Sequence, residues 1–377
     1  MSGELGDDDP KKWLYTEHAR VKHEIQYRYL GAWLAILGRT MSPLVLFDGF
    51  AGRGRYTGGE PGSPLLFWRR AVEAVEGERP EEVEIQCVEL HPKNFEFLKA
   101  EIASLSHPRV SIDASNGYFA EEALRKAEEL SKRNWIPPVF WTADPFGFKG
   151  VPLEIVRQLM KKERWEVMIT FMVRDMRRFL SEENFEAPLN EFFGGSAWRG
   201  CLQLAPGEDR EQKLLLVYSE VIRKSVAKFA TPFRVFEDDR TQTLYYLVHL
   251  TNNPLGMRKM KEAMVKQSPD MTFWPVTRRD PNQIALDVAE EEPYPSLQAH
   301  LEERFEAQTL SFVDLLNTDY PDGAWIEPEY RKAILALERD ERVIITRNRS
   351  TPQQRKPTGL KEADTVAFVG HQQLTLG

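Results

Sequence analysis

Apolar positions along the first half of the chain alternate between helical spacing and short continuous runs. Residues 17–38 repeat apolar side chains at helical spacing, as at Ile25, Tyr29 and Trp33, which predicts a long amphipathic helix. The runs that follow predict strands at 45–47, 83–90, 109–113, 137–143 and 166–172, with helices at 64–78, 92–104, 118–132 and 152–162 between them. Strands that alternate with helices of this length predict a doubly wound α/β fold with a parallel sheet and right-handed crossovers.

The pattern changes beyond Arg174. Helices are expected at 184–193 and 210–228, and two apolar runs follow at 233–238 and 243–251. The short link between these runs permits an antiparallel hairpin. A parallel sheet closed by an antiparallel hairpin is the arrangement of class I methyltransferases, so analogy of fold predicts a Rossmann-like sheet of seven strands.

The last part of the chain has a different composition. Proline and acidic residues become frequent between 276 and 296, which is typical of a linker. Residues 297 to about 348 then show helix, helix and the strand VIITR, the size and order of a winged helix. We therefore expect a disordered start at 1–12, a class I methyltransferase-like domain at 13–275, a linker at 276–296, and a winged-helix-like α+β domain with a basic wing or tail at 297–377.

Composition and charge narrow the classes of function. Two cysteines are too few for a disulfide framework or a cysteine-based metal site, and the histidines lack ligand spacing, so no metal is expected. No apolar run approaches the ~18 residues that span a bilayer, and the acidic start is unlike a signal peptide, so we expect a cytoplasmic protein. The net charge of −8 argues against indiscriminate nucleic-acid binding, although a local basic patch could override it.

The stretch LVLFDGFAGRGRY at 44–56 runs from an apolar strand into a glycine-rich turn. The dinucleotide fingerprint fails because Thr57 stands where its third glycine belongs, and the phosphate loop fails because Arg55 and Tyr56 replace its lysine and hydroxyl. What remains is acid-x-F-x-G-x-G, a pattern of S-adenosylmethionine sites; the alternative is a purely structural strand-to-helix turn. The residues expected to hold this cofactor are Asp48, which reaches its ammonium group, and Gly49, Phe50, Ala51, Gly52 and Gly54, whose backbone passes close to its methionine part.

Two further strand ends offer groups for a nucleoside cofactor. Glu89 ends the second expected strand, where an acid accepts hydrogen bonds from both ribose hydroxyls; the alternative is a solvated acid. After the third strand, Asp113 and Asn116 compete for the amino group of the adenine. All of these residues are expected at the carboxyl edge of the sheet.

The segment Asp144-Pro145-Phe146-Gly147 leaves the fourth strand at the same edge. In amino-methyltransferases, a (D/N)-P-P-(Y/F) segment accepts hydrogen bonds from the substrate amine while its aromatic ring stacks on the base. These contacts position the nitrogen lone pair for methyl transfer. Phe146 and Gly147 replace the second proline and the aromatic, so stacking falls to Phe146 or Phe148, and a plain turn is the alternative.

The turn FDGFAGRGRYTGGEPGSPL, the segment DPFGFKGVP and the stretches YLGAWLAIL (29–37) and NPLGMRKMKEAM (253–264) together resemble the three-Cys-motif partner protein family. Their order and spacing agree from about Trp13 to Arg347, with Arg53 where that family more often has proline. The turn also looks like that of the RNA adenine-N6 methyltransferases of bacterial ribosomes. The resemblance implies a methyltransferase-like fold, Asn116 at the adenine, and an association with a three-cysteine iron–sulfur partner protein.

Two groups of cations could contact phosphate. Arg174, Arg177 and Arg178 follow the fifth strand at the carboxyl edge, although a solvated helix face also explains them. The segment 342–361 carries six cations and no acid, among them Arg347 and Arg349. This pattern predicts either a basic wing that binds along a phosphate backbone or a disordered tail.

These observations favour an S-adenosylmethionine-dependent methyltransferase that acts on an amino nitrogen of a nucleic-acid base, with RNA favoured over DNA. The catalytic residues would be those of the Asp144–Gly147 segment, and substrate contacts would come from Phe148, Arg174, Arg347 and Arg349. The alternative is a non-catalytic partner of a radical-type iron–sulfur protein, which the altered D-P-F-G segment keeps open.

Overall fold

A computed structural model describes residues 13–236, 242–267, 294–321, 325–348 and 359–369 of the chain. The chain divides into two compact units, Met1–Phe273 and Trp274–Gly377. No helix in the described ranges is long and apolar enough to cross a membrane. The predicted N-terminal segment and most of the predicted linker lie outside the described residues.

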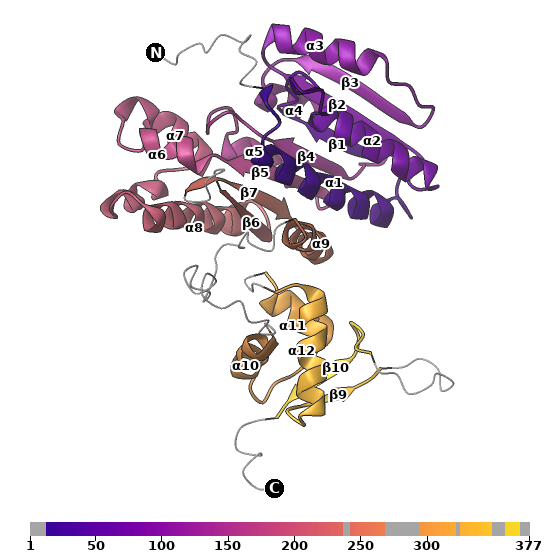
Figure 1. The fold of residues 1–377 in the computed structure, drawn as a ribbon, viewed down its shortest axis with the longest axis vertical. Coiled ribbons are helices and arrows are strands. Elements are labelled where there is room, and N and C mark those ends of the chain that lie inside the picture. The colour runs from indigo at the N-terminus through magenta and orange to yellow at the C-terminus, as the bar shows by residue number, and fades with distance from the viewer. Residues whose placement is uncertain (1–12, 237–241, 268–293, 322–324, 349–358, 370–377) are drawn as a thin grey trace. The chain divides into compact units, whose positions relative to one another are not determined.

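The first unit is built on one sheet of seven strands (Figure 1). The strands are β1 (Leu44–Asp48), β2 (Val83–Glu89), β3 (Val110–Asn116), β4 (Val139–Ala143), β5 (Trp165–Phe171), β6 (Phe229–Phe236) and β7 (Thr243–Thr251). They lie in the order β3-β2-β1-β4-β5-β7-β6, with β7 antiparallel to both of its neighbours. This order is the class I methyltransferase arrangement, so the predicted fold class is confirmed.

Helices flank both faces of this sheet. They are α1 (Glu17–Leu37), α2 (Ser63–Glu76), α3 (Pro92–Ala103), α4 (Phe119–Ser131), α5 (Leu153–Leu159), α6 (Val173–Phe179), α7 (Glu186–Phe193), α8 (Glu208–Ser225) and α9 (Pro254–Val265), with 3₁₀ turns at Glu183–Phe185 and Ala197–Gln203. The N-terminal helix α1 contacts both α2 and α9. Sequence analysis did not predict α9 as a helix, and it considered a helix at α6 only as an explanation of the three arginines there. The start of α9 is nonetheless encoded locally, because the Asn253 side chain accepts hydrogen bonds from the first N–H groups and Pro254 follows it.

Burial explains why the central strands read as continuous apolar runs. Every residue of β1, β4 and β5 is buried. In the middle of the sheet, the Trp141 ring lies against Phe47 and Trp165, with ring centroids 4.6 and 5.2 Å apart. Parallel strands covered by helices on both faces have no solvent side, so they need no polar alternation. The carboxyl ends of these strands are therefore held in a rigid frame.

The second unit contains α10 (Tyr294–Arg304), β8 (Thr309–Ser311), α11 (Phe312–Asp319), α12 (Glu327–Arg339), β9 (Val343–Thr346) and β10 (Thr365–Phe368). The three strands form an antiparallel sheet in the order β8-β10-β9. Helix α10 begins inside the predicted linker, and β8 and β10 were not predicted. A winged helix for this unit stays a prediction, and most of the segment between β9 and β10 lies outside the described residues.

Candidate active site at the carboxyl edge of the sheet

The strand register brings three acids to one edge. Asp48 at the end of β1 pairs with Cys87 on one side and with Thr142 on the other. Glu89 lies two residues beyond Cys87, and Asp144 lies two residues beyond Thr142. In open α/β sheets, ligands bind outside this edge, where the strand order reverses. The sheet therefore places the three predicted acids around one candidate site.

The glycine turn after β1 has the conformation that its sequence requires. A Cβ at Gly49 would lie 2.2 Å from the Phe119 ring and 2.8 Å from the carbonyl oxygen of Thr142. Gly52 and Gly54 have φ values of 63° and 82°, which side chains rarely tolerate. The turn is bound to the sheet, because the Gly49 N–H donates to the Thr142 carbonyl at 3.0 Å.

Asp48 is the most enclosed acid of the site. It is 2% exposed, and its Oδ1 accepts hydrogen bonds from the Thr142 hydroxyl at 3.3 Å and the Phe50 N–H at 3.4 Å. Its Oδ2 is buried and accepts no hydrogen bond from the described part of the chain. Burial raises the pKa of Asp48 to about 6, with the Ser63 hydroxyl and the Phe50 N–H acting in the opposite direction. Within the described residues Asp48 forms no ion pair, although the charge of Lys22 also acts to lower its pKa.

Glu89 and Asn116 lie opposite each other in the register of β2 and β3. The two carboxylate oxygens of Glu89 accept hydrogen bonds from the N–H groups of Gly52 at 2.9 Å and His91 at 2.8 Å. Burial raises the pKa of Glu89, while these N–H groups act to lower it. The Asn94 side chain also hydrogen-bonds to this carboxylate and acts to lower its pKa. A carboxylate has about four acceptor positions, so Glu89 can still accept from a hydroxyl group.

The amide of Asn116 donates to the carbonyl oxygens of Glu89 and Leu90, at 2.8 and 2.9 Å. Those donors are occupied by the protein, so the amide is oriented toward the end of β2. Asp113 lies three residues earlier, paired with Gln86, and its carboxylate accepts from the Ala114 N–H at 2.8 Å. Of the two adenine candidates, Asn116 is therefore the one at the carboxyl edge.

Asp144 forms an ion pair with Lys22 of α1, a contact that sequence analysis missed. The side chains of Lys22 and Asp144 are 13% and 32% exposed. Burial opposes ionisation of Asp144, but the attraction of Lys22 and hydrogen bonds from Lys22 and Thr170 hold the pKa of its carboxyl below the usual value. Burial likewise acts to lower the pKa of Lys22, and Asp144 raises it above its usual value. Both groups are charged at neutral pH.

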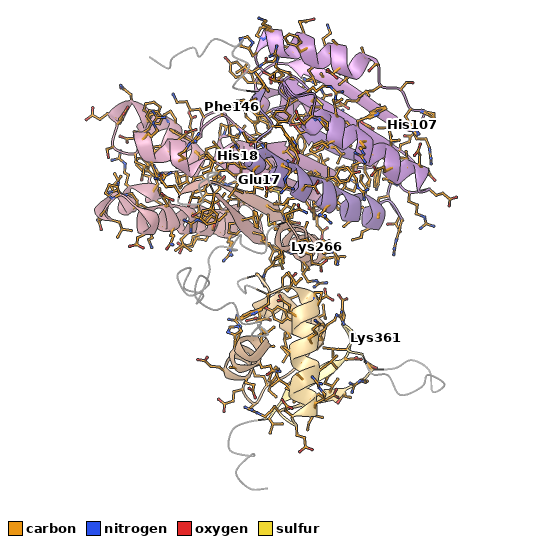
Figure 2. All side chains as sticks on the ribbon, in the orientation of Figure 1. Glu17, His18, His107, Phe146, Lys266 and Lys361 are labelled. Atoms are coloured by element: carbon orange, nitrogen blue, oxygen red, sulfur yellow. The ribbon has the colours of Figure 1, made fainter. Side chains whose placement is uncertain are left out.

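The two candidate aromatics of the D-P-F-G segment have opposite environments. Phe146 is 90% exposed, and the Trp13 ring approaches it edge-on with centroids 6.4 Å apart (Figure 2). Phe148 is 3% exposed and packs against Phe179 and Phe185. The expected substrate contact of Phe148 is therefore corrected: this ring fills the core beside α6, and Phe146 is the ring available for stacking. Gly147, with φ of 101°, allows the turn between them.

Trp13 also covers the glycine turn. Its carbonyl oxygen accepts from the Thr57 N–H at 2.8 Å, and a Cβ at Gly52 would lie 2.9 Å from its ring. The Arg53 guanidinium lies over the Trp13 and Phe97 rings, 5.8 and 3.9 Å from their centroids. Arg53, which stands where the three-Cys-motif partner family more often has proline, thus links Trp13 to Phe97 of α3.

Aromatic side chains and a neutral histidine surround the Lys22–Asp144 pair. His23 stacks on Tyr15 and lies near Tyr56, with ring centroids 5.6 and 5.7 Å away. Burial, aided by the charge of Lys22, lowers the pKa of His23 to about 3, so this histidine stays neutral. One sequence signal could have revealed Lys22. It lies 4, 7 and 11 residues before the buried Gln26, Tyr29 and Trp33, and therefore on the buried face of α1.

The arginines after β5 have different surroundings. The Arg174 side chain is 46% exposed and lies 3.6 Å from the Asp175 carboxylate. Arg177 donates to the Glu211 carboxylate at 2.5 Å and to the Thr243 carbonyl at 3.1 Å. Arg177 therefore links α6 to α8 and β7, which explains it structurally.

Arg347 does not offer a free guanidinium. It donates two hydrogen bonds to the Glu338 carboxylate, at 2.6 and 2.7 Å, and this pairing raises its pKa. The predicted phosphate contact of Arg347 would require this bidentate pair to open, so that contact stays a prediction. Arg349 lies outside the described residues.

No family model matches the chain, and no curated protein matches it. The chain is similar to the solved structure of a Legionella pneumophila protein of family DUF519, with 13% identity over 66% of this chain and 90% of that chain and a TM-score of 0.41. It is also similar to human methyltransferase-like protein 13 in complex with SAH, with 12% identity over 73% of this chain and 96% of that chain and a TM-score of 0.36. A third similar structure is precorrin-6y C5,15-methyltransferase from Geobacter metallireducens, with 12% identity over 59% of this chain and 87% of that chain and a TM-score of 0.29. At these TM-scores, the fold assignment depends on the strand order. The three-Cys-motif partner family stays a prediction.

Proposed function

We propose that this protein is an S-adenosylmethionine-dependent methyltransferase that modifies an amino nitrogen of a nucleic-acid base, with RNA favoured. The observation that carries the proposal is the pair of carboxylates at one sheet edge. The buried Oδ2 of Asp48 accepts no hydrogen bond from the described residues, and the attraction of Lys22 keeps Asp144 ionised. The first suits a cationic cofactor group, and the second suits a hydrogen-bond-donating substrate.

The residues present fit the cofactor. The unpartnered Oδ2 of Asp48 matches an ammonium group, since a buried carboxylate oxygen gains most from a charged donor. Glu89 would hold the ribose hydroxyls, and Asn116 would hold the adenine. The turn from Gly49 to Gly54 brings backbone close to the methionine part. When bound, S-adenosylmethionine supplies an electrophilic methyl group.

Asp144 and Phe146 would act on the substrate. The ionised Asp144 accepts a hydrogen bond from the base amine and turns its lone pair toward the methyl donor, while Phe146 stacks on the base. Lys22 keeps Asp144 ionised but occupies it in the free protein, so the substrate amine must share or replace that contact. Because its pKa is lowered, Asp144 orients the amine without retaining the proton that methylation releases, and solvent takes that proton.

The pH dependence of cofactor binding follows from Asp48. Since an ammonium group favours the ionised carboxylate, affinity should be constant above the pKa of about 6 and fall by up to tenfold per pH unit below it. Calorimetry with S-adenosylhomocysteine should show proton release on binding at pH 5.5 and little at pH 8. The Asp48→Asn variant should lose this proton linkage. Equal affinity at both pH values would contradict the ammonium contact.

Lys22 is expected to act as a positioning residue for Asp144. In Lys22→Met, the attraction and hydrogen bond of Lys22 no longer oppose burial, so the pKa of the Asp144 carboxyl rises and the acid limb of the pH–rate profile moves to higher pH, although the Thr170 hydrogen bond still acts to lower that pKa. Lys22→Arg keeps the charge and should restore the wild-type profile. A purely structural role would lower the rate at every pH without moving the profile.

A second candidate function is a non-catalytic partner of a three-cysteine iron–sulfur protein. One observation favours it: the Lys22 ammonium group already occupies the Asp144 carboxylate. Under this alternative, the wild type transfers no methyl group and the ion pair serves only the fold, so Lys22→Met should lower thermal stability without changing cofactor binding. The departure of the D-P-F-G segment from the amino-methyltransferase pattern also favours the non-catalytic function.

The test of the proposed function is transfer of a labelled methyl group. Purified protein is incubated with methyl-labelled S-adenosylmethionine and either total RNA or single-stranded DNA, and the nucleosides are identified by mass spectrometry. The proposal expects an N-methylated base in RNA that forms much more slowly with Asp144→Asn. Cofactor binding without transfer to either polymer would favour the partner function. Methylation of a protein or a small molecule would refute the nucleic-acid substrate.

A further inference from the structure

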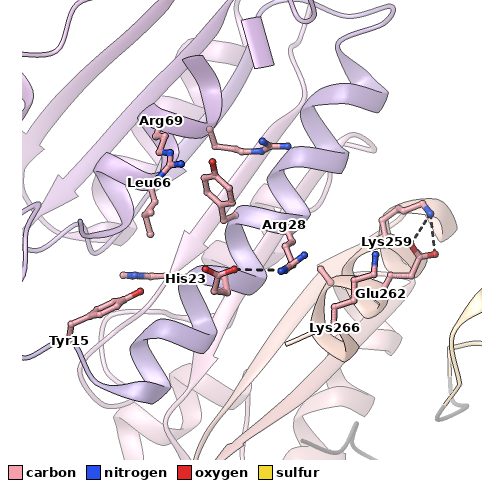
Figure 3. Close-up of a pocket in the computed structure, with 12 residues that line it drawn as sticks. Tyr15, His23, Arg28, Leu66, Arg69, Lys259, Glu262 and Lys266 are labelled. Atoms are coloured by element: carbon pink, nitrogen blue, oxygen red, sulfur yellow. Dashed lines mark hydrogen bonds and ion pairs between the residues drawn. The ribbon is translucent and has the colours of Figure 1, made fainter. Parts of the chain in front are cut away.

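A surface groove lies on α1 where this helix meets α2 and α9 (Figure 3). It encloses about 500 Å³, within the range of ligand sites. Its cationic side chains come from all three helices: Arg28, Arg69, Arg70, Lys259 and Lys266. We call this surface the basic groove. None of the predicted cofactor residues lines it.

Charge in the basic groove is opposite to that of the whole protein. Five cations and only two carboxylates, Glu24 and Glu262, line it, whereas the chain carries a net charge of −8. His23 contributes no charge, because its pKa is about 3. A local excess of cations on an acidic protein favours a polyanion that binds at this place and not elsewhere.

Most of these cations have only weak competing partners. Their ion pairs are with acids three or four residues away on the same helix: Arg28 with Glu24 at 3.8 Å, Arg69 and Arg70 with Glu73 at 3.1 and 2.7 Å, and Lys259 with Glu262 at 2.9 Å. Lys266 forms no ion pair within the described ranges. The pairs of Arg28 and Arg69 are exposed, and those of Arg70 and Lys259 are partly buried. Pairs between neighbouring positions of one helix contribute little stability, so phosphates can displace them.

Aromatic rings accompany the cations. The guanidinium groups of Arg69 and Arg70 lie 5.6 and 5.1 Å from the centroid of the Tyr27 ring. Tyr15, stacked on His23, lines the same groove. Surfaces for single-stranded nucleic acid combine a cationic track with rings on which bases stack. An acidic peptide would need the cations but not the rings.

The basic groove is connected to the candidate active site through shared residues. Tyr15 and His23 line the groove, and both rings also contact Tyr56, at 5.0 and 5.7 Å between centroids. Lys22, next to His23 in the chain, is paired with Asp144. The charges of Lys22 and Asp144 both act on the pKa values of His23 and Tyr56, so the rings at this end of the groove lie near the acceptor carboxylate.

We propose that the basic groove binds the phosphodiester backbone of a single-stranded nucleic acid and so presents a base to Asp144. The presentation step rests on the proposed function, but the binding step does not. The basic wing of the second unit is not required for it.

The test compares two triple variants that remove equal charge. The groove variant is Arg28→Gln, Lys259→Gln and Lys266→Gln. The control variant is Lys99→Gln, Lys132→Gln and Lys224→Gln, three exposed lysines on other helices that also pair with nearby glutamates. Binding of fluorescent single-stranded RNA and DNA of one sequence is measured by anisotropy between 0.05 and about 0.3 M salt. A polyglutamate peptide is the competing probe.

The groove variant should bind RNA on the order of 100-fold more weakly at about 0.1 M salt, with the slope of log affinity against log salt reduced by about 2, because each lost phosphate contact removes about 0.7. The control variant should keep the wild-type slope. Equal slopes in both variants, no nucleic-acid binding by the wild type, or tighter binding of polyglutamate would each overturn the proposal. Preference between RNA and DNA identifies the polymer. Calorimetry with S-adenosylhomocysteine tests the proposed function separately, since the groove variant should bind it normally.

Discussion

Asp144→Asn is expected to slow methyl transfer by roughly 30- to 1000-fold while the affinity for the cofactor stays close to that of the wild type. One charged hydrogen bond that orients the reacting amine contributes about 2–4 kcal/mol to lowering the barrier. Asparagine keeps the shape of the side chain but removes the negative charge that Lys22 holds in place. The loss should therefore appear in kcat, measured with labelled cofactor at saturating RNA.

Glu154→Gln is the matched control for this variant. It neutralises a carboxylate on α5 that is also paired with a cation, Arg157, but lies away from the acceptor segment. Thermal unfolding of Asp144→Asn must be recorded as well, because the variant leaves the largely buried Lys22 without its partner. Wild-type turnover by a folded Asp144→Asn protein would show that this carboxylate does not position the amine.

Asp48→Asn is expected to weaken S-adenosylhomocysteine binding on the order of 100- to 1000-fold, because removing one member of a buried charge pair costs about 2–5 kcal/mol. The same change should not destabilise the protein at pH 7 to 8. The folded-state pKa of about 6 exceeds the ordinary 3.8, so the ionised carboxylate opposes folding by about 3 kcal/mol above pH 6. That opposition disappears as the pH falls through the window from 6 to 4.

Calorimetry and thermal unfolding at pH 7.5 check both parts of this expectation. Asp113→Asn provides the control, since it neutralises an exposed acid on the adjacent part of the sheet. Lost affinity with equal or higher thermal stability identifies Asp48 as a residue kept for binding. If Asp48→Asn binds the ligand like the wild type, the ammonium of the cofactor lies elsewhere.

Local sequence patterns predicted most of the sheet. The strands β1, β2, β4 and β5 are buried apolar runs between helices, so periodicity and crossover rules predict a parallel sheet with one carboxyl edge, whereas the strand order was predicted by analogy of fold. The turn from Gly49 to Gly54 was likewise recognisable, because its glycines have no room for a side chain or have positive φ. Asn253 and Pro254 show that even the missed helix α9 carries a local start signal.

Contacts between distant segments could not be predicted in this way. Lys22 and Asp144 are 122 residues apart, and only the packing of α1 on the sheet brings them together. The difference between Phe146 and Phe148 arises at a turn, where periodicity does not tell the buried ring from the exposed one. Arg347 looked cationic in sequence, but Glu338 on the preceding helix neutralises it.

The basic groove also arises from contacts between distant segments, so the sequence did not predict it. Its cations are spread over three helices whose sequences show ordinary charged surfaces with neighbouring acids. Only the packing of α1 with α2 and α9 concentrates them beside Tyr27. Net charge alone therefore hid a surface that suits a polyanion.

The most direct test of the central claim is a crystal structure of the protein with S-adenosylhomocysteine. The account predicts the ammonium group of the ligand at Oδ2 of Asp48, its ribose hydroxyls at Glu89 and its adenine beside Asn116, with Asp144 and Phe146 facing the sulfur. A ligand bound away from the Asp48–Gly54 turn, or no bound ligand at saturating concentration, would contradict the account.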